Sequence, residues 1–266
     1  MRQSCKVWKD SWWFGVPVSR AVEGKIGPYA MAEGYVAVRP GGTEFELLTP
    51  PGFCILGLVI KQDELLEHMQ DTEGADLTAS LLRRELLEIG AEQQRRLAYE
   101  FQQILTADTT ALEHPQARRM LREALLCALT AACCQHLDTR EEVLTHLGRH
   151  SLVRRVREYA LAHSDEPLTI PEVCRVFRVS RRTLQYSFQD VVGISPGAYL
   201  RIQRLNGVRR TLRNAGTPAA RDANAAPVEV QDAAARWGFW HLSQFASDYK
   251  KLFGKRPSET LRRRSA

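Results

Sequence analysis

The sequence lacks the long apolar segments that membrane insertion and secretion require. No run of about eighteen or more apolar residues occurs among its 266 residues, and a helix that crosses a bilayer needs such a run. The N-terminal segment MRQSCKVWKD also lacks the apolar stretch of a secretory signal. We therefore expect a cytoplasmic protein with no membrane partner.

The sequence has few of the residues that metal and redox chemistry use. Its 6 cysteines form no C-x-x-C pair, so we expect buried thiols that act as small hydrophobic side chains. None of its 7 histidines lies in the strand-rich segment 7–60, where a cupin-type metal oxygenase would need them. We predict neither a metal site nor a cofactor.

Two further signatures of enzymes are missing. A phosphate-binding loop of the G-x-x-x-x-G-K-[ST] type does not occur, which disfavours nucleotide hydrolysis. A cysteine that accepts methyl groups needs an activated thiolate, whereas Cys133 and Cys134 lie in an apolar segment with helical spacing. We predict that the protein is not an enzyme.

Acidic residues are scarce in the second part of the chain. The net charge of +6 divides into −5 for residues 1–150 and +11 for residues 151–266. A basic part beside an acidic part is typical of a polyanion-binding domain joined to a regulatory domain. The alternative is chance clustering of charge on a solvated surface.

The first sixty residues show the pattern of β-strands. Segments rich in Val, Ile, Leu and Phe at 35–38, 45–48 and 53–60 alternate with turns at 27–28, 40–42 and 50–52 that contain Gly and Pro. We expect an antiparallel unit of four to six strands between residues 7 and 60. That is few for a closed barrel, which usually has about eight. The fold class is therefore α+β, with a partial cupin-like barrel, helices over 61–148 and an all-helical C-terminal domain.

The spacing of apolar residues changes to the helical period after Lys61. We expect helices at Asp63–Met69, Leu77–Glu88, Glu92–Leu105 and Gln116–His136. In the last of these, Leu, Met and Ala form one broad stripe from Met120 to Ala132. A stripe this long indicates either a buried core helix or a subunit interface, and both readings stay open.

A helix-turn-helix pattern follows a helix expected at Ser151–His163. Thr169 is a suitable N-cap for a helix over Pro171–Phe177, and Ser180 for a second helix over Arg181–Val192 that ends at Gly193. A short helix, a turn of three or four residues and a second helix define the motif. Polar and cationic residues occupy the outward positions of the second helix, as a helix in the DNA major groove requires.

The same pattern recurs about sixty residues later. Ile170, Val173, Phe177 and Val179 correspond to Val230, Ala233, Trp237 and Phe239 at an offset of 60, and the later apolar positions correspond at an offset of 61. A helix over 195–215 joins the two units. A helix of about twenty residues spans roughly 30 Å, close to the roughly 34 Å of one turn of B-DNA. We expect two recognition helices in successive major grooves.

Residues 151–262 resemble the DNA-binding domain of the AraC/XylS family of transcription regulators. The motifs that carry the resemblance are SRRTLQYSF at 180–188, GISP at 193–196, RWGF at 236–239, QFASDY at 244–249 and LFGKRP at 252–257. The run GFWHLSQF at 238–245 also resembles the subgroup that contains ethanolamine operon regulators. The resemblance implies that both recognition helices contact bases and that the N-terminal domain senses a small molecule or mediates dimerisation.

The chain departs from the family pattern in two places. Only about 60 residues precede the first expected helix, fewer than the β-barrel of such regulators usually has. Thr217–Pro227 forms a long loop with Ala and Pro before the second unit, and we expect it at the surface.

The candidate DNA-binding residues come from the outward positions of both recognition helices. They are Ser180, Arg181, Arg182, Thr183, Gln185, Tyr186, Gln189, His241, Ser243, Gln244, Ser247, Lys250 and Lys251. Arg181 and Arg182 suit either bases or phosphates, and Gln185 suits an adenine edge. Lys250 and Lys251 suit phosphates, so the first helix is expected to read more bases than the second.

These observations predict a two-domain regulator. Residues 1–148 form a sensor and dimerisation domain, and residues 149–266 carry helix-turn-helix units at about 168–193 and 228–254. The expected partners are double-stranded DNA, RNA polymerase, a small-molecule effector and a second copy of the chain. We expect an activator that responds to a metabolite. The alternative is a ligand-independent dimeric DNA-binding protein whose N-terminal domain serves only protein interaction.

Overall fold

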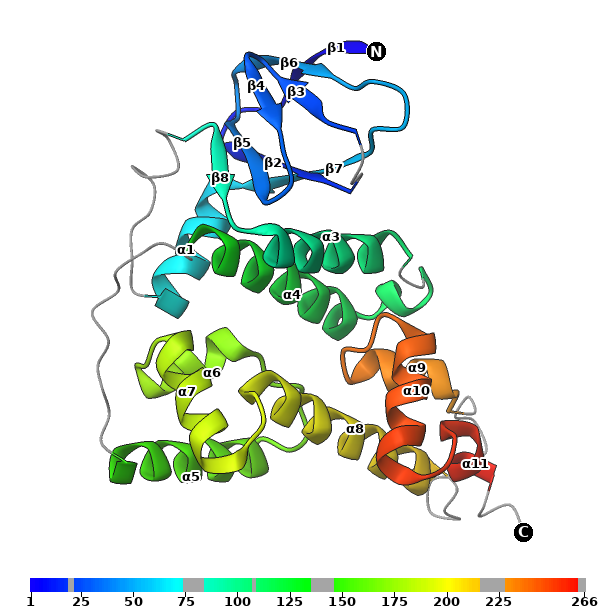
Figure 1. Cartoon of the computed structure of the whole chain (residues 1–266). Coiled ribbons are helices and arrows are strands. Elements are labelled where there is room, and N and C mark those ends of the chain that lie inside the picture. The colour runs from blue at the N-terminus through cyan, green and yellow to red at the C-terminus, as the bar shows by residue number, and fades with distance from the viewer. Residues whose placement is uncertain (19–21, 74–83, 107–108, 135–145, 216–227, 263–266) are drawn as a thin grey trace. The chain divides into compact units, whose positions relative to one another are not determined.

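The computed structural model describes residues 1–18, 22–73, 84–106, 109–134, 146–215 and 228–262. The chain divides into two compact units (Figure 1). The first comprises Met1–Ile104 with Leu125–Arg140, and the second comprises Leu105–Ala124 with Glu141–Ala266. The expected division at residue 148 assigned 105–124 to the N-terminal domain, whereas this segment groups with the C-terminal elements.

The first unit contains two antiparallel sheets of four strands. One sheet has the order β1-β6-β3-β4 and the other the order β7-β2-β5-β8. The strands are β1 (Arg2–Lys6), β2 (Ser11–Pro17), β3 (Gly24–Ile26), β4 (Tyr29–Met31), β5 (Tyr35–Pro40), β6 (Glu44–Leu48), β7 (Ile55–Lys61) and β8 (Leu86–Glu88). Strand β2 is the centre of its sheet because it pairs with β7 on one side and β5 on the other. The unit is thus α+β, as predicted.

The strands extend beyond the expected limits of 7 and 60. Strand β1 precedes residue 7 and pairs with β6, and β8 lies within the helix expected at Leu77–Glu88. That helix is wrong at its end, because Leu86–Glu88 form an edge strand in which Leu87 is buried opposite Val36. Residues 77–83 lie outside the described residues. Six of the eight described strands, β2 to β7, lie between residues 11 and 61, in agreement with the expected four to six, and β1 and β8 lie outside that segment.

Tryptophans occupy both faces of β2. Trp12 is fully buried and, with Phe14 and Val16, packs in a core that also contains residues of helices. The next residue, Trp13, points to the opposite face and lies 4.8 Å from the ring of Phe45 of the other sheet. Both faces of the strand are therefore buried, which explains its nearly continuous apolar sequence.

Helices complete the first unit. They are α1 (Gln62–Glu73), α3 (Ala91–Leu105) and the last part of α4 (Pro115–Cys133). Leu129 and Ala132 of the apolar stripe of α4 are buried in the same cluster as Trp12, whereas Leu121, Ala124, Leu125 and Ala128 are half-buried, so a subunit interface on this stripe stays a prediction. The first part of α4, with Ala117 and Met120, belongs to the second unit.

The second unit is helical. Besides η1 (Ala111–Glu113), it contains α5 (His146–Ala162), α6 (Ile170–Phe177), α7 (Arg181–Val192), α8 (Pro196–Ala215), α9 (Val230–Arg236), α10 (Leu242–Phe253) and α11 (Pro257–Arg262). The observed helices α6, α7, α8 and α10 agree closely with the expected ones. The expected surface loop at Thr217–Pro227 lies outside the described residues.

The two larger hydrophobic cores among the described residues of this unit both contain side chains of α8. The first core joins α5, α6 and α7 around Leu184 and Phe188, and Leu200 of α8 completes it. The second joins α9 and α10 around Phe245 and Tyr249, together with Leu205, Val208 and Leu212 of α8. Each helix-turn-helix unit thus has its own core, and the helix between them belongs to both (Figure 1).

Gly238 allows a test of how the first part of α4 packs against the turn before α10. Gly238 has a φ of 76°, and a Cβ added there would lie 2.2 Å from Cγ of Met120. Gly254 has a φ of 71° but no atom within 4 Å of such a Cβ. We expect Gly254→Ala to lower the free energy of unfolding by about 1 kcal/mol through backbone strain alone. Gly238→Ala should cost about 1–3 kcal/mol more, because Met120 has to move. Urea denaturation of both variants measures the difference, and equal costs would contradict the packing of Met120 on this turn.

Candidate nucleic-acid interface

Local hydrogen bonds define the first helix-turn-helix unit. The Thr169 hydroxyl accepts from the Glu172 backbone N–H at 3.4 Å, and the Glu172 carboxylate accepts from the Thr169 N–H at 2.7 Å, which completes a capping box. Helix α6 ends at Arg178 with a φ of 52°, and Ser180 then caps α7 by accepting from the N–H of Thr183 at 3.1 Å. The turn between the two helices is therefore specified by its own residues.

The second helix-turn-helix unit has the same arrangement of turn and caps. Gly238, at the position that corresponds to Arg178, also has a positive φ, of 76°. The Nδ1 atom of His241 accepts from the Gln244 N–H at 3.2 Å and caps α10. Gly193 and Gly254 end α7 and α10 in the left-handed conformation. The repeat inferred from the sequence is thus present in the structure.

Helix α7 presents a polar face opposite its buried side chains. Leu184 and Phe188 are fully buried, whereas Arg182, Gln185, Tyr186 and Gln189 are exposed. The guanidinium of Arg182 lies 5.6 Å from the ring centroid of Tyr186, so one side chain positions the other. Ser180 and Thr183 are held by each other at the helix start. Arg181 is half-buried beside them.

Helix α10 presents a comparable face. Ser243, Gln244, Ser247, Lys250 and Lys251 are exposed, and Phe245 and Tyr249 are buried. The ring of His241 holds the helix cap, so one nitrogen of this candidate residue is already in use. As expected, two of the exposed residues in the last turn are lysines.

A chain of polar contacts orients Gln244. Its amide donates to Oδ1 of Asp248 at 2.8 Å, and Oδ2 of Asp248 accepts from Nε of Arg201 at 2.6 Å. Arg201 lies on α8, so this chain fixes a candidate base-reading residue to the helix between the two units. Sequence reasoning missed Arg201 and Asp248, because they lie 47 residues apart and no local spacing indicates their pairing.

Arg119 makes a second contact that the sequence did not indicate, and this contact binds the first helix-turn-helix unit. Arg119 of α4 binds the Glu172 carboxylate and the Pro167 carbonyl, each at 2.6 Å. On the other side of the same segment, Ala117 packs against Ala235 of α9. Residues 105–124 therefore contact both helix-turn-helix units. These contacts fall between distant positions of the chain and have no signature in the sequence.

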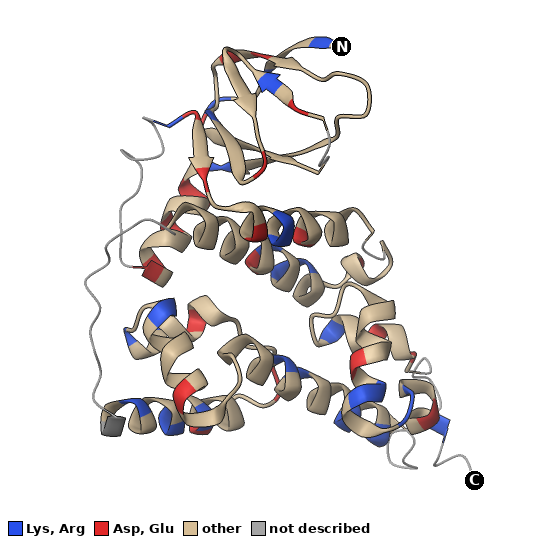
Figure 2. Cartoon of the chain, in the orientation of Figure 1, with Lys and Arg blue, Asp and Glu red and all other residues tan. Residues whose placement is uncertain are grey.

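Basic side chains gather on the helices of the second unit (Figure 2). Helix α8 has five arginines and no acidic residue. Several of these arginines lie over aromatic rings: Arg209 is 4.6 Å from the Phe253 ring centroid and Arg210 is 5.6 Å from that of Trp237. Such contacts compensate part of the mutual repulsion. The surface suits a polyanion.

Several other chemistries have little support among the described residues. No three His, Cys, Asp or Glu side chains in the described ranges come together so that they could hold a metal ion. Burial raises the pKa of the Cys133 thiol, and the adjacent Cys134 adds to this effect, so the reactive thiolate is disfavoured. None of the helices in the described part of the chain is both long and apolar enough to cross a membrane.

Comparison with known proteins agrees with this geometry. Residues 173–263 match the family described as "Helix-turn-helix domain". The chain is 40% identical over 150 residues to the "Probable thc operon regulatory protein" of Rhodococcus erythropolis, which covers 56% of this chain and 42% of that protein. It is 30% identical over 110 residues to "XylDLEGF operon transcriptional activator 3" of Pseudomonas putida, covering 41% of this chain and 31% of that one.

One solved structure is also similar to part of the chain. A probable AraC family transcriptional regulator from Rhodopseudomonas palustris is 35% identical, with a TM-score of 0.36 and coverage of 43% of this chain and 97% of that chain. The C-terminal part of the chain is a helix-turn-helix domain similar to those of AraC/XylS transcription regulators. The chain spans less than half the length of the two curated relatives named above. The closer resemblance to ethanolamine operon regulators stays a prediction.

The first unit contains a hollow of about 480 Å³ that opens to solvent. Arg39 lines it and is only 7% exposed; its guanidinium binds Oε2 of Glu85 at 2.7 Å and lies 5.9 Å from the ring centroid of Phe45. Burial lowers the pKa of Arg39, and the Glu85 carboxylate acts in the opposite direction. Glu44 and Glu46 add further carboxylates to the wall.

The Arg201–Asp248 pair can be tested by its removal. Arg201→Met leaves the Asp248 carboxylate, whose side chain is 24% exposed, without its cation. We expect a loss of about 1–2 kcal/mol in the free energy of unfolding, between the values for surface and buried pairs. The matched control is Arg95→Met, which removes a pair with Glu33 whose side chains are both about half exposed. Urea denaturation should place the control close to wild type; an equal loss in both variants would contradict the linking role of Arg201.

Proposed function

We propose that the protein reads DNA with α7 and α10 in successive major grooves on one face of the duplex. The observation that carries this proposal is the pair of exposed polar faces, each opposite its own core and both attached to α8. Helix α8 has 20 residues and so spans about 30 Å, close to one turn of B-DNA. All thirteen candidate residues lie on α7 and α10 or at their N-caps.

We expect α7 to contact mainly bases and α10 to contact mainly phosphates. Gln185 is exposed on α7, and its amide matches the donor and acceptor pair on the major-groove edge of adenine. Lys250 and Lys251 end α10 and suit phosphates, which carry no sequence information. Gln244, oriented by Asp248, is the best candidate for base contact on α10.

A footprint on a bound operator tests the arrangement. We expect hydroxyl-radical cleavage of the DNA to show two protected patches about one helical turn apart. Gln185→Ala should lower the affinity for that operator about tenfold, as loss of a bidentate base contact does, and leave non-specific binding unchanged.

The matched control is Gln70→Ala, which removes an exposed glutamine of α1 in the first unit. It should bind the operator as wild type does. Protection of a single groove would contradict the two-helix proposal, and a loss of non-specific as well as specific affinity in Gln185→Ala would assign that residue to the backbone.

We further propose that the first unit binds a small metabolite. In response, the protein activates transcription. It does so as a homodimer that contacts RNA polymerase. The name of the relative from Pseudomonas putida, a transcriptional activator, supports the sign of regulation. The hollow beside Arg39 supports the effector. Glu85 is paired with Arg39 and Glu46 with Arg2, so Glu44, whose carboxylate accepts a hydrogen bond from Ser4, is the wall residue that favours an amine over a carboxylic acid.

A thermal-shift panel tests the effector. Small amines should raise the Tm by about 2–4 °C, whereas carboxylic acids of matched size should not. Glu44→Gln removes one wall carboxylate and should reduce the shift. The control Glu33→Gln lies outside the hollow, paired with Arg95, and should keep it. If no compound changes the Tm or the DNA affinity, the ligand-independent alternative holds, with the first unit used only for protein interaction.

A further inference from the structure

The side-chain amide of Gln244 is held in one orientation. Its Nε2 atom donates to Oδ1 of Asp248 at 2.8 Å, one turn further along α10. A carboxylate accepts hydrogen bonds but cannot donate them, so the nitrogen of the amide, and not its oxygen, faces Asp248. The Oε1 atom of Gln244 therefore lies on the other side of the amide, and it makes no hydrogen bond with any residue that the structure describes.

Arg201 holds the other oxygen of the same carboxylate. Its Nε atom donates to Oδ2 of Asp248 at 2.6 Å, and its Nη2 atom lies 2.5 Å from that oxygen. The guanidinium also lies 5.4 Å from the ring centroid of Phe239, which is 3% exposed, so its position is set by the core of the second helix-turn-helix unit. A guanidinium can only donate. Each oxygen of Asp248 therefore faces a donor, one on α8 and one on α10.

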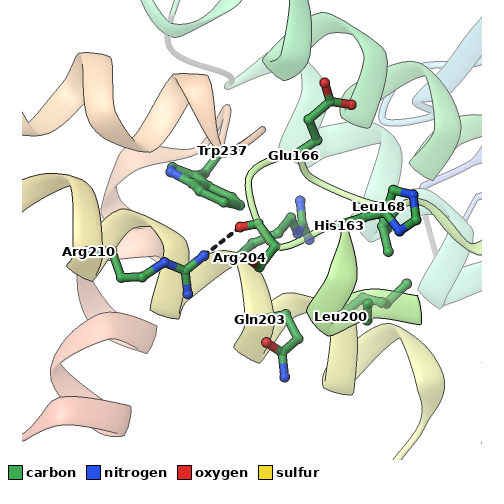
Figure 3. A pocket seen from close by; sticks show the side chains of 10 residues that line it. His163, Glu166, Leu168, Leu200, Gln203, Arg204, Arg210 and Trp237 are labelled. Atoms are coloured by element: carbon green, nitrogen blue, oxygen red, sulfur yellow. Dashed lines mark hydrogen bonds between the residues drawn. The ribbon is translucent and has the colours of Figure 1, made fainter. Parts of the chain in front are cut away.

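Two neighbouring arginines of α8 are directed to other groups. Arg210 donates to the backbone carbonyl of Ser164, the dashed line in Figure 3. Arg204 is 8% exposed, and its Nη1 atom lies 3.4 Å from the carbonyl of Gly238. We therefore expect neither of them to replace Arg201 at Asp248 when Arg201 is removed.

We propose that Arg201 determines which bases α10 prefers, through Asp248 and Gln244. The inference rests on the proposed function, in which Gln244 contacts a base. An amide that presents its oxygen accepts from the amino group of adenine or cytosine, whereas guanine and thymine carry oxygen acceptors at the same places in the major groove. The second helix-turn-helix unit thus selects adenine or cytosine over guanine or thymine where Gln244 contacts the DNA. Arg201 and Asp248 are positioning residues, and neither needs to touch DNA.

Replacing Asp248 by asparagine should invert this preference. Asp248→Asn keeps the shape of the side chain, but one oxygen becomes an NH2 group. Because Arg201 only donates, it takes the remaining oxygen, and the NH2 group then faces Gln244. The Gln244 amide turns over to accept from it and presents its own NH2 group to the DNA. That donor suits the O6 atom of guanine or the O4 atom of thymine.

A selection from random DNA duplexes with the full chain measures the preference. The positions whose preference is lost in Gln244→Ala are those that Gln244 contacts. There, wild type should favour adenine or cytosine about tenfold, and Asp248→Asn should favour guanine or thymine by a similar factor. When Asp248→Asn is combined with Arg201→Met, the new amide is free to turn, so the preference should shrink rather than invert. An inversion as complete as in Asp248→Asn alone would contradict the role of Arg201.

The matched control is Asp190→Asn on α7, which removes the same charge from a residue that pairs with Arg149 at 3.3 Å. It should keep the wild-type preference at the positions that Gln244 contacts. A role of Arg201 in packing alone would lower the affinity for all duplexes alike and leave the preference as it is. If Asp248→Asn folds poorly, Asp248→Ala takes its place: it frees the Gln244 amide, and a preference as strong as that of wild type would overturn the proposal.

The outcomes separate this inference from the proposed function. If Gln244→Ala abolishes the preference and Asp248→Asn leaves it unchanged, Gln244 reads a base but Arg201 does not set its orientation, and only the present inference fails. If Gln244→Ala changes no preference at any position, Gln244 reads no base, and the base contact in the proposed function fails with it.

Discussion

Helix α8 contributes side chains to two hydrophobic cores, and the geometry of the second unit depends on this constraint. Leu200 belongs to the core of the first helix-turn-helix unit, whereas Leu205, Val208 and Leu212 belong to that of the second. Within the second group the backbone at Gly207 approaches Trp237 so closely that an added Cβ would clash with the ring. Neither recognition helix can shift against α8 without disturbing a packed core.

Much of the second unit could be predicted from local signals. Thr169 with Glu172, Ser180 with Thr183, and the glycines at 193 and 254 specify helix ends within three or four residues, so their meaning can be read without knowledge of the fold. The repeat at an offset of about 60 gives the same pattern of apolar residues a second time. The outward faces of α7 and α10 followed directly, because helical periodicity separates them from Leu184 and Phe245.

What could not be predicted depends on partners distant in the sequence. Leu86–Glu88 follow an apolar pattern that suits a helix or a strand, and only pairing with β5 makes them a strand. The same holds for Arg201 with Asp248 and for Arg119 with Glu172. These ion pairs join residues 47 and 53 positions apart, and a single sequence does not reveal such distances.

The packing of residues 105–124 on the second unit has a consequence for dissecting this protein. A fragment that begins near residue 149 appears complete on sequence grounds, since both helix-turn-helix units are present. It would nevertheless lack Ala117 and Met120, and so expose Ala235 and the turn at Gly238 to water. Glu172 would also lose Arg119. Low solubility or weak operator binding of such a fragment would result from the apolar surface exposed by the loss of residues 105–124. It would not indicate a defect in the recognition helices α7 and α10.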